Sequence, residues 1–151
     1  MKTGVHVGRL PDLAVLEDVR VKGESTKEWL DAFHEMSGTS LDHRALHEKI
    51  LRAIVASTGF AVIDQVPGRV VGCALGVVQG SWMGIFDVVI AREARRCGHG
   101  ERLVRGLMAW GRAAGASQAY LQVAADNAAA LALYKKLGFH EAYGYWYRVK
   151  R

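Results

Sequence analysis

The segment from Phe60 to Ile90 constrains the fold more than any other part of the sequence. It contains three runs rich in β-branched and other apolar residues, and a short glycine-containing turn joins each run to the next. The runs are residues 60–66, 69–79 and 81–90, and the turns are Pro67-Gly68 and Gln79-Gly80. This pattern predicts three antiparallel strands in a meander, and therefore a β-sheet at the centre of the fold.

After the meander the apolar period changes to that of helices. One predicted helix ends at Gly115 and another runs from Asn127 to Gly138, with a short buried strand at residues 119–123 between them. The apolar faces are Leu103, Leu107, Trp110 and Ala114 in the first helix, and Ala130, Leu131, Tyr134 and Leu137 in the second. Residues 139–148, broken at Gly144, are expected to add a final strand pair. This order predicts an α/β fold in which a mixed sheet contains parallel pairing.

The region before the meander is less regular. Val19–Lys22 is a candidate strand, and Ser25-x-x-Glu28 is a capping box that predicts a helix burying Trp29, Leu30 and Phe33. The spacing of Leu46, Ile50, Leu51 and Ile54 indicates a second helix. Residues 1–18 show no clear pattern, so we treat them as an N-terminal extension of a single domain at residues 19–151.

Composition excludes several classes of protein. The chain has 151 residues, of which 50% are hydrophobic and 23% charged, as expected for one globular domain. It has no apolar run long enough to span a membrane and no signal-peptide pattern, so a cytoplasmic location and no membrane partner are expected. Cys73, Cys97 and the six histidines show no metal-ligand spacing. Reduced thiols and no metal follow.

The formal net charge is +5, and many of the cations gather at one place. Five arginines surround a glycine-rich turn, namely Arg92, Arg95, Arg96, Arg102 and Arg105. No run of basic residues interleaved with aromatics is present, so nucleic acid is an unlikely partner. This distribution favours a compact anionic ligand.

The glycine-rich turn lies between an apolar strand and a helix. Gly98 and Gly100 allow close approach of a ligand to the backbone, and the N-terminus of the following helix offers N–H groups to an anion. A Gly-x-Gly before a helix is weak evidence alone. The full pattern Arg95-x-x-Gly98-x-Gly100, however, resembles the (Gln/Arg)-x-x-Gly-x-(Gly/Ala) signature of the GCN5-related N-acetyltransferase (GNAT) superfamily. Residues 121–139 are also similar to the C-terminal half of ribosomal-protein alanine acetyltransferases.

This resemblance implies a GNAT fold, with a twisted mixed sheet, helices on both faces and a splayed central strand pair. It also implies acetyl-CoA as co-substrate and an amine as acceptor. The coenzyme-binding residues implied are Val88, Val89 and Ile90 beside pantetheine, Arg95, Arg96, Cys97, Gly98, His99 and Gly100 around the pyrophosphate, and Asn127 and Tyr134 near the pantetheine arm and sulfur.

Catalytic roles follow less directly. Tyr134 has the family spacing for a general acid, although its place on an apolar helix face also suits a core residue. Alanine acetyltransferases of this type carry a Glu where this chain has Gln122, and an amide cannot accept the proton of the amine. We expect Asp87 to be the general base, acting through water, since Glu93 lies in the turn, where solvated carboxylates are common.

The sequence therefore predicts an N-acetyltransferase that acts on a primary amine of an unidentified small molecule or peptide by direct transfer in a ternary complex. A non-catalytic acetyl-CoA-binding module, acting as a sensor or partner domain, is the alternative. A homodimer or a missing tandem domain also stays open.

Overall fold

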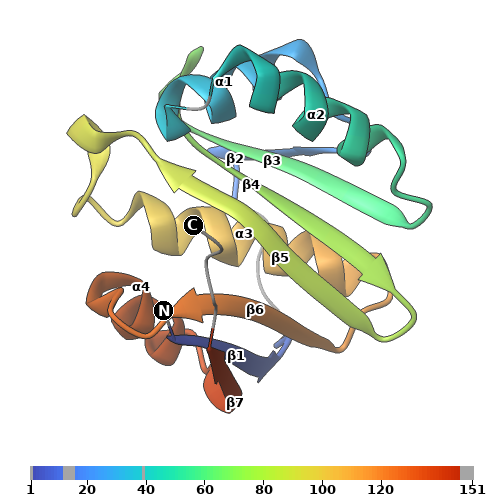
Figure 1. Ribbon diagram of the computed structural model, residues 1–151, viewed down its shortest axis with the longest axis vertical. Helices are drawn as coiled ribbons and strands as arrows, with labels where there is room; N and C mark the ends of the chain where they lie inside the picture. Colours follow the sequence, from blue (N-terminus) through green and yellow to red (C-terminus); the bar gives the residue numbers. More distant parts are fainter. Residues whose placement is uncertain (1, 12–15, 39, 147–151) are drawn as a thin grey trace.

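The computed structural model describes residues 2–11, 16–38 and 40–146, which form one mixed sheet with helices on both faces (Figure 1). The strands are β1 (Lys2–Arg9), β2 (Val19–Lys22), β3 (Ser57–Val66), β4 (Arg69–Gln79), β5 (Trp82–Ile90), β6 (Gln118–Ala124) and β7 (His140–Trp146). The helices are α1 (Lys27–Ser37), α2 (Leu41–Arg52), α3 (His99–Ala113) and α4 (Ala128–Lys136), with a short 3-10 helix at Arg92–Ala94. The strand order is β2-β3-β4-β5-β6-β1-β7.

The predicted meander is confirmed. Strands β2 to β5 pair antiparallel in sequence order, and Gly68 and Gly80 have positive φ angles of 86° and 62° in the two turns. The predicted parallel pairing is also present, because β5 and β6 run parallel after the α3 crossover. The mixed α/β architecture expected from the sequence is therefore correct.

Alternate residues of the central strands supply the two faces of the sheet. Phe60 and Val62 pack in a cluster with Trp29 of α1 and Leu51 of α2, while Ile63 packs on the opposite face in the cluster that contains α3 and Tyr134. The indole Nε1 of Trp29 donates a hydrogen bond to the carbonyl oxygen of Ala74, 3.0 Å away, so α1 is fixed directly to β4.

Two details of the first two helices differ from the predictions. The cap of α1 is Thr26 rather than Ser25, since Thr26 Oγ1 accepts a hydrogen bond from the backbone N–H of Trp29. In α2, Leu46 and Ile50 are each 56% exposed and Ile54 lies beyond the helix. The inward side of α2 carries Leu51 and, one turn earlier, His47, so the neighbouring stripe with Leu46 and Ile50 turns toward solvent.

The segment before Val19 contributes a strand of the sheet. Lys2–Arg9 forms β1, which lies between β6 and β7 and is antiparallel to both. The expectation of a strand pair within residues 139–148 was wrong: His140–Trp146 is a single strand that continues through Gly144 and pairs with β1. Residues 147 and 148 lie outside the described part of the chain. No helix in the described ranges is both long and apolar enough to cross a membrane.

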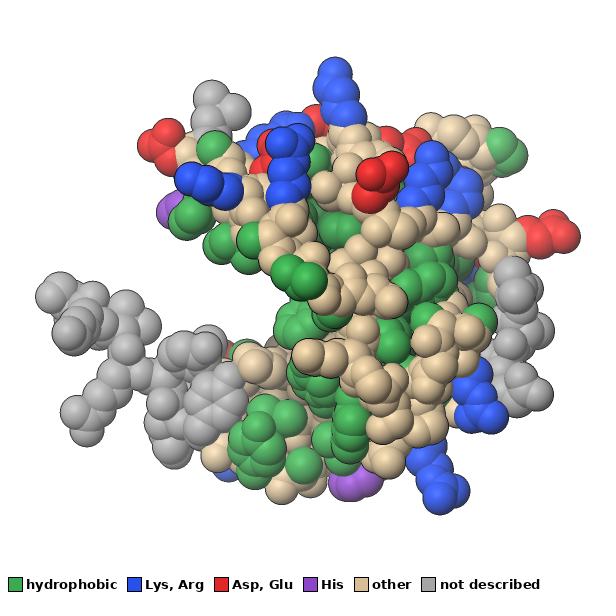
Figure 2. All heavy atoms as spheres, turned by 90° about the vertical axis from the view of Figure 1, so that its right-hand side faces the viewer, with side chains coloured by type: hydrophobic (Ala, Val, Ile, Leu, Met, Phe, Trp, Pro, Cys, Tyr) green, Lys and Arg blue, Asp and Glu red, His purple; other side chains and the backbone are tan. Residues whose placement is uncertain are grey.

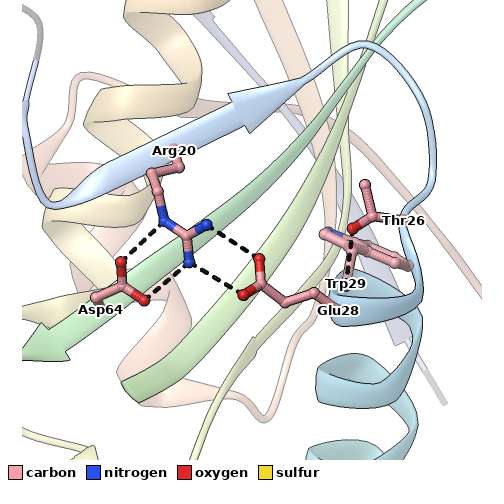
Figure 3. Close-up of polar contacts among 5 residues, drawn as sticks. All are labelled: Arg20, Thr26, Glu28, Trp29 and Asp64. Carbon is pink, nitrogen blue, oxygen red and sulfur yellow. Dashed lines mark hydrogen bonds and ion pairs between the residues drawn. The ribbon is translucent and has the colours of Figure 1, made fainter. Parts of the chain in front are cut away.

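A charged network fixes α1 to the edge of the sheet (Figure 3). The guanidinium of Arg20 on β2 forms two hydrogen bonds with Asp64 on β3, at 2.9 and 3.0 Å, and two with Glu28 on α1, at 3.0 and 3.4 Å. These carboxylates, Asp64 first, raise the pKa of Arg20 further above its ordinary value. The side chain of Asp64 is only 13% exposed, and Arg20 is its ion-pair partner.

We expect Arg20→Ala to lower the free energy of unfolding by about 1–2 kcal/mol, because it leaves Asp64 without its cation. Urea unfolding checks this value. Arg52→Ala is the matched control, since Arg52 is 72% exposed and pairs with Glu48 on its own helix, so its loss should be below about 0.5 kcal/mol. Equal small losses for the two variants would contradict a stabilising role for the network.

Candidate active site

Strands β5 and β6 separate after a short stretch of pairing. Only three residue pairs join them, from Trp82 with Gln118 to Gly84 with Tyr120. Beyond this point β5 contains a bulge: Cys73 pairs with Val89 and Leu75 with Phe86, so two residues of β5, Asp87 and Val88, lie opposite the single residue between them on β4. Asp87 has a φ of 56°, which is uncommon for a residue with a side chain. Such a bulge bends its strand, and here β5 turns away from β6.

The separation opens a cleft of about 1080 Å³ between the two strands and the helices α3 and α4. In the space-filling view, a hollow divides the upper part of the molecule, with α1 and α2, from the lower part, with β6, β1 and β7, and hydrophobic side chains line it (Figure 2). Eleven of the twelve residues predicted for the site line the cleft: Asp87, Val88, Val89, Ile90, Arg95, Arg96, Gly98, His99, Gly100, Asn127 and Tyr134. Cys97 is exposed in the same loop and is absent from the lining, and its thiol points to the carbonyl of Arg95.

One end of the cleft is the loop that leads into α3. Gly98 caps the helix in the left-handed region, at φ 81°, and Arg96 also has a positive φ of 65°. The ring Nδ1 of His99 lies 3.0 Å from the carbonyl oxygen of Ala94, and the guanidinium of Arg95 donates to the carbonyl of Ile90 at 3.2 Å. These contacts fold the loop around the first N–H groups of α3, which carry a partial positive charge suited to an anion.

The same end contains a carboxylate that sequence reasoning had not considered. Glu101, in the first turn of α3, lines the cleft and forms ion pairs with Lys136 of α4 at 2.9 Å and with Arg105 at 3.2 Å. The pairing, with Lys136 first, lowers the pKa of Glu101. Two cations therefore offset its negative charge, and the net charge of this end stays favourable for an anionic ligand. Lys136 also links α4 to the start of α3.

Helix α4 supplies the opposite wall. The side-chain oxygen of Asn127 caps the helix by accepting a hydrogen bond from the N–H of Ala130, at 3.2 Å. Tyr134 is 7% exposed, packs edge-to-face on Phe139 and lines the cleft, so it is both a core residue and a wall residue. Burial raises the pKa of Tyr134 to about 12, which keeps its hydroxyl protonated throughout the neutral range.

The comparison with known families agrees with this geometry. A family model described as the acetyltransferase (GNAT) family matches residues 23–139, most of the chain. The chain belongs to this family. A curated relative, the uncharacterized N-acetyltransferase YobR of Bacillus subtilis (strain 168), is 32% identical over 129 residues, which cover 85% of this chain and 51% of the relative. The chain thus spans about half the length of this relative.

Two solved structures share the fold. The structure of AAC(6')-Iy in complex with the bisubstrate analogue CoA-S-monomethyl-acetylneamine is 15% identical and superposes with a TM-score of 0.67, covering 88% of this chain and 98% of that one. The ribosomal-protein-S18-alanine N-acetyltransferase of Escherichia coli is 22% identical, with a TM-score of 0.64 and coverage of 83% and 79%. The GNAT fold with a splayed strand pair, expected from the two motifs, is confirmed.

Behind the GNAT cleft, Asp87 is connected to two histidines. Asp87 Oδ2 lies 2.8 Å from His47 Nε2 on α2, and His47 Nδ1 lies 3.0 Å from His34 Nε2 on α1. Sequence reasoning missed both histidines, since they lie on different helices with no motif spacing between them. The signal that could have indicated His47 is its position one turn before Leu51, on the inward side of α2.

The remaining residues considered from the sequence are also placed. Gln122 on β6 lines the cleft, so the position at which related enzymes carry a Glu does face it. Glu93 lies in the short 3-10 helix and is absent from the lining. Within the described residues, no group of three or more His, Cys, Asp or Glu side chains could hold a metal ion.

Proposed function

We propose that this chain is an N-acetyltransferase that binds acetyl-CoA in the β5–β6 cleft and transfers its acetyl group to an amine in a single ternary complex. The observation that carries the proposal is the continuity of the cleft. It runs from the cationic loop at the start of α3, past the separated edge of β5, to the hydroxyl-bearing wall at Tyr134. Membership of the GNAT family and the coenzyme analogue bound to a protein of the same fold support it.

The separated edge of β5 suits pantetheine. Residues 85–90 have no strand partner on their β6 side in the described part of the chain, so their backbone groups on that side are available to the amide groups of the coenzyme arm. The loop at Gly98 and Gly100 would hold the pyrophosphate at the N-terminus of α3. In this proposed arrangement the thioester would lie near the middle of the cleft, between the bulge at Asp87 and Tyr134.

The proposed chemistry is attack of a neutral amine on the thioester carbonyl. A backbone N–H of the Val88–Ile90 segment would stabilise the oxyanion, and the cleft would supply orientation of the two reactants. Tyr134 would donate its proton to the departing thiolate, and its phenolate would recover a proton from the acetylated nitrogen. Because the pKa of Tyr134 is about 12, the two transfers have to be closely coupled, since a phenol alone is a weaker acid than the coenzyme thiol.

An acceptor screen tests the proposal. The wild-type chain is first titrated with acetyl-CoA by calorimetry without added metal, and then assayed for release of coenzyme A thiol with amino acids, aminoglycosides, polyamines and N-terminal peptides. We expect saturable binding and amine-dependent thiol release. Binding without release for any amine would favour the non-catalytic coenzyme-binding module, and no binding by a folded sample would contradict both functions.

A further inference from the structure

Hydrogen bonds connect three side chains at the wall of the cleft. They are His34 on α1, His47 on α2 and Asp87 on β5. His47 has a side chain 19% exposed and Asp87 one that is 28% exposed, while His34 is 5% exposed. The ring of His47 also packs against Phe33 at a centroid distance of 4.7 Å and against Trp29 at 6.0 Å. Aromatic contacts and two hydrogen bonds therefore hold His47 in one orientation.

The hydrogen bonds set the positions of the protons. An ionised Asp87 can only accept, so Nε2 of His47 carries the proton that lies between them. In neutral His47, Nδ1 is then an acceptor, and it receives the N–H at Nε2 of His34. The remaining nitrogen of His34, Nδ1, is buried with no hydrogen-bond partner among the described residues. Donation thus runs in one direction, from His34 through His47 to Asp87.

His34 opposes protonation of His47. A proton added to His47 at Nδ1 would face the N–H of His34, unless His34 moved its own proton to its buried Nδ1, where a donor without a partner is unfavourable. Burial first, and the neighbouring His47 next, lower the pKa of His34, so His34 itself stays neutral. Other charged and titratable groups lie near these three side chains. They are Arg44 and Glu48 on α2, Asp31 on α1, which pairs with Arg44, and Cys73 on β4.

We propose that His47 is the positioning residue of the acceptor site, that its Nε2–H holds the Asp87 carboxylate as proton acceptor for the substrate ammonium, and that His34 maintains the required tautomer. Both ring nitrogens of His47 are occupied, so it cannot itself contact the amine. Asp87 Oδ1, in contrast, has no hydrogen-bond partner in the described ranges, and Asp87 lines the cleft. This inference rests on the proposed function and deepens it by assigning the residues that hold Asp87 in place as proton acceptor.

The proton balance is complete. One N–H bond of the substrate ammonium breaks, its electron pair stays on nitrogen, and an O–H bond forms at Asp87 Oδ1. The neutral amine attacks the thioester carbon, the C–S bond breaks, and the thiolate takes the proton of Tyr134, whose phenolate then takes one proton from the acetylated nitrogen. The proton on Asp87 passes to solvent, so each turnover yields amide, thiol and one proton.

Four variants test whether His47 and His34 position Asp87 or only stabilise the fold. For each variant, kcat/KM for the amine is measured as a function of pH. His47→Gln keeps an N–H that can reach Asp87 but cannot be protonated, so the acidic limb should move to lower pH by roughly one unit or disappear. His34→Leu removes the donor that opposes protonation, so the same limb should move to higher pH by roughly one unit. His34→Gln restores a donor and should return the limb to the wild-type position. His43→Gln replaces an exposed histidine in the first turn of the same helix, is the matched control and should change nothing.

Opposite shifts in His47→Gln and His34→Leu, with acetyl-CoA affinity unchanged, support the assignment. Unchanged limbs in both variants, or shifts in the same direction, overturn it. If His34→Leu does not fold, His47→Gln decides alone, and an unchanged limb overturns the proposal. As a further arm, Asp87→Asn should lower kcat about 100-fold, and near wild-type turnover also overturns it. A wild-type chain that acetylates no amine contradicts the proposed function as a whole, whereas active wild type with an unaltered His47→Gln profile contradicts this role only.

Discussion

Replacement of Tyr134 by phenylalanine is expected to lower kcat by about 100-fold or more, while acetyl-CoA affinity and thermal stability change little. The substitution removes one hydroxyl and keeps the ring that packs on Phe139. If the hydroxyl protonates the coenzyme thiolate, its loss removes the proton donor that the α4 wall of the cleft holds in position. Steady-state kinetics with an identified acceptor, together with calorimetry of acetyl-CoA binding, measures both quantities on the same protein.

The contrary outcome is equally well defined. If Tyr134 were only a core residue, the variant would lose about 1 kcal/mol of unfolding free energy and keep nearly full turnover. Tyr143→Phe is the control for the substitution, because Tyr143 is 62% exposed on β7 and absent from the cleft lining.

Since the pKa of Tyr134 is about 12, its neutral form persists well above the usual assay range, so no loss of activity between pH 7 and 10 should come from its ionisation.

Gly98→Glu is expected to remove measurable acetyl-CoA binding, a loss of roughly 100-fold or more in affinity. The residue caps α3 in the left-handed region and lines the cleft, so the new carboxylate would enter the place proposed for the pyrophosphate and repel it. Calorimetry at modest salt measures the change, and circular dichroism verifies the fold.

The backbone strain of this variant needs its own control. Gly98→Ala carries the same unfavourable φ without the charge or the length, and apart from its chain neighbours no described residue comes within 4 Å of the Cβ that it adds. It should therefore bind acetyl-CoA with a smaller loss, about tenfold or less. Equal losses in the Ala and Glu variants would show that backbone conformation, and not charge, determines binding, and wild-type affinity in Gly98→Glu would place the coenzyme elsewhere.

Features encoded by neighbouring residues were predictable from the sequence. The turns at Gly68 and Gly80, the helix start at Asn127 and the helix stop at Gly115 each depend on a few adjacent residues, and all are present. The two motifs of the cleft likewise lie within short segments, so their residues could be named before their arrangement was known.

Features that depend on distant partners could not be predicted. The apolar spacing of Leu46 and Ile50 indicated a buried face, but the position of α2 over α1 turns it outward and directs His47 to Asp87 instead. The contact between His47 and Asp87 joins residues 40 positions apart, and no local pattern indicates it. The partner of β7 was missed for the same reason, because it is the N-terminal strand.

The placement of β1 between β6 and β7 affects when the wall of the cleft can fold. Strand β6, which forms one wall of the cleft, is paired with β5 over only three residues but with β1 over seven. A ribosome releases β1 before β6 and β7, so β1 cannot pair with them until the segment between has been made. The β6 wall therefore gains its main support only when β1 pairs with β6, and coenzyme binding would report that this long-range pairing has formed.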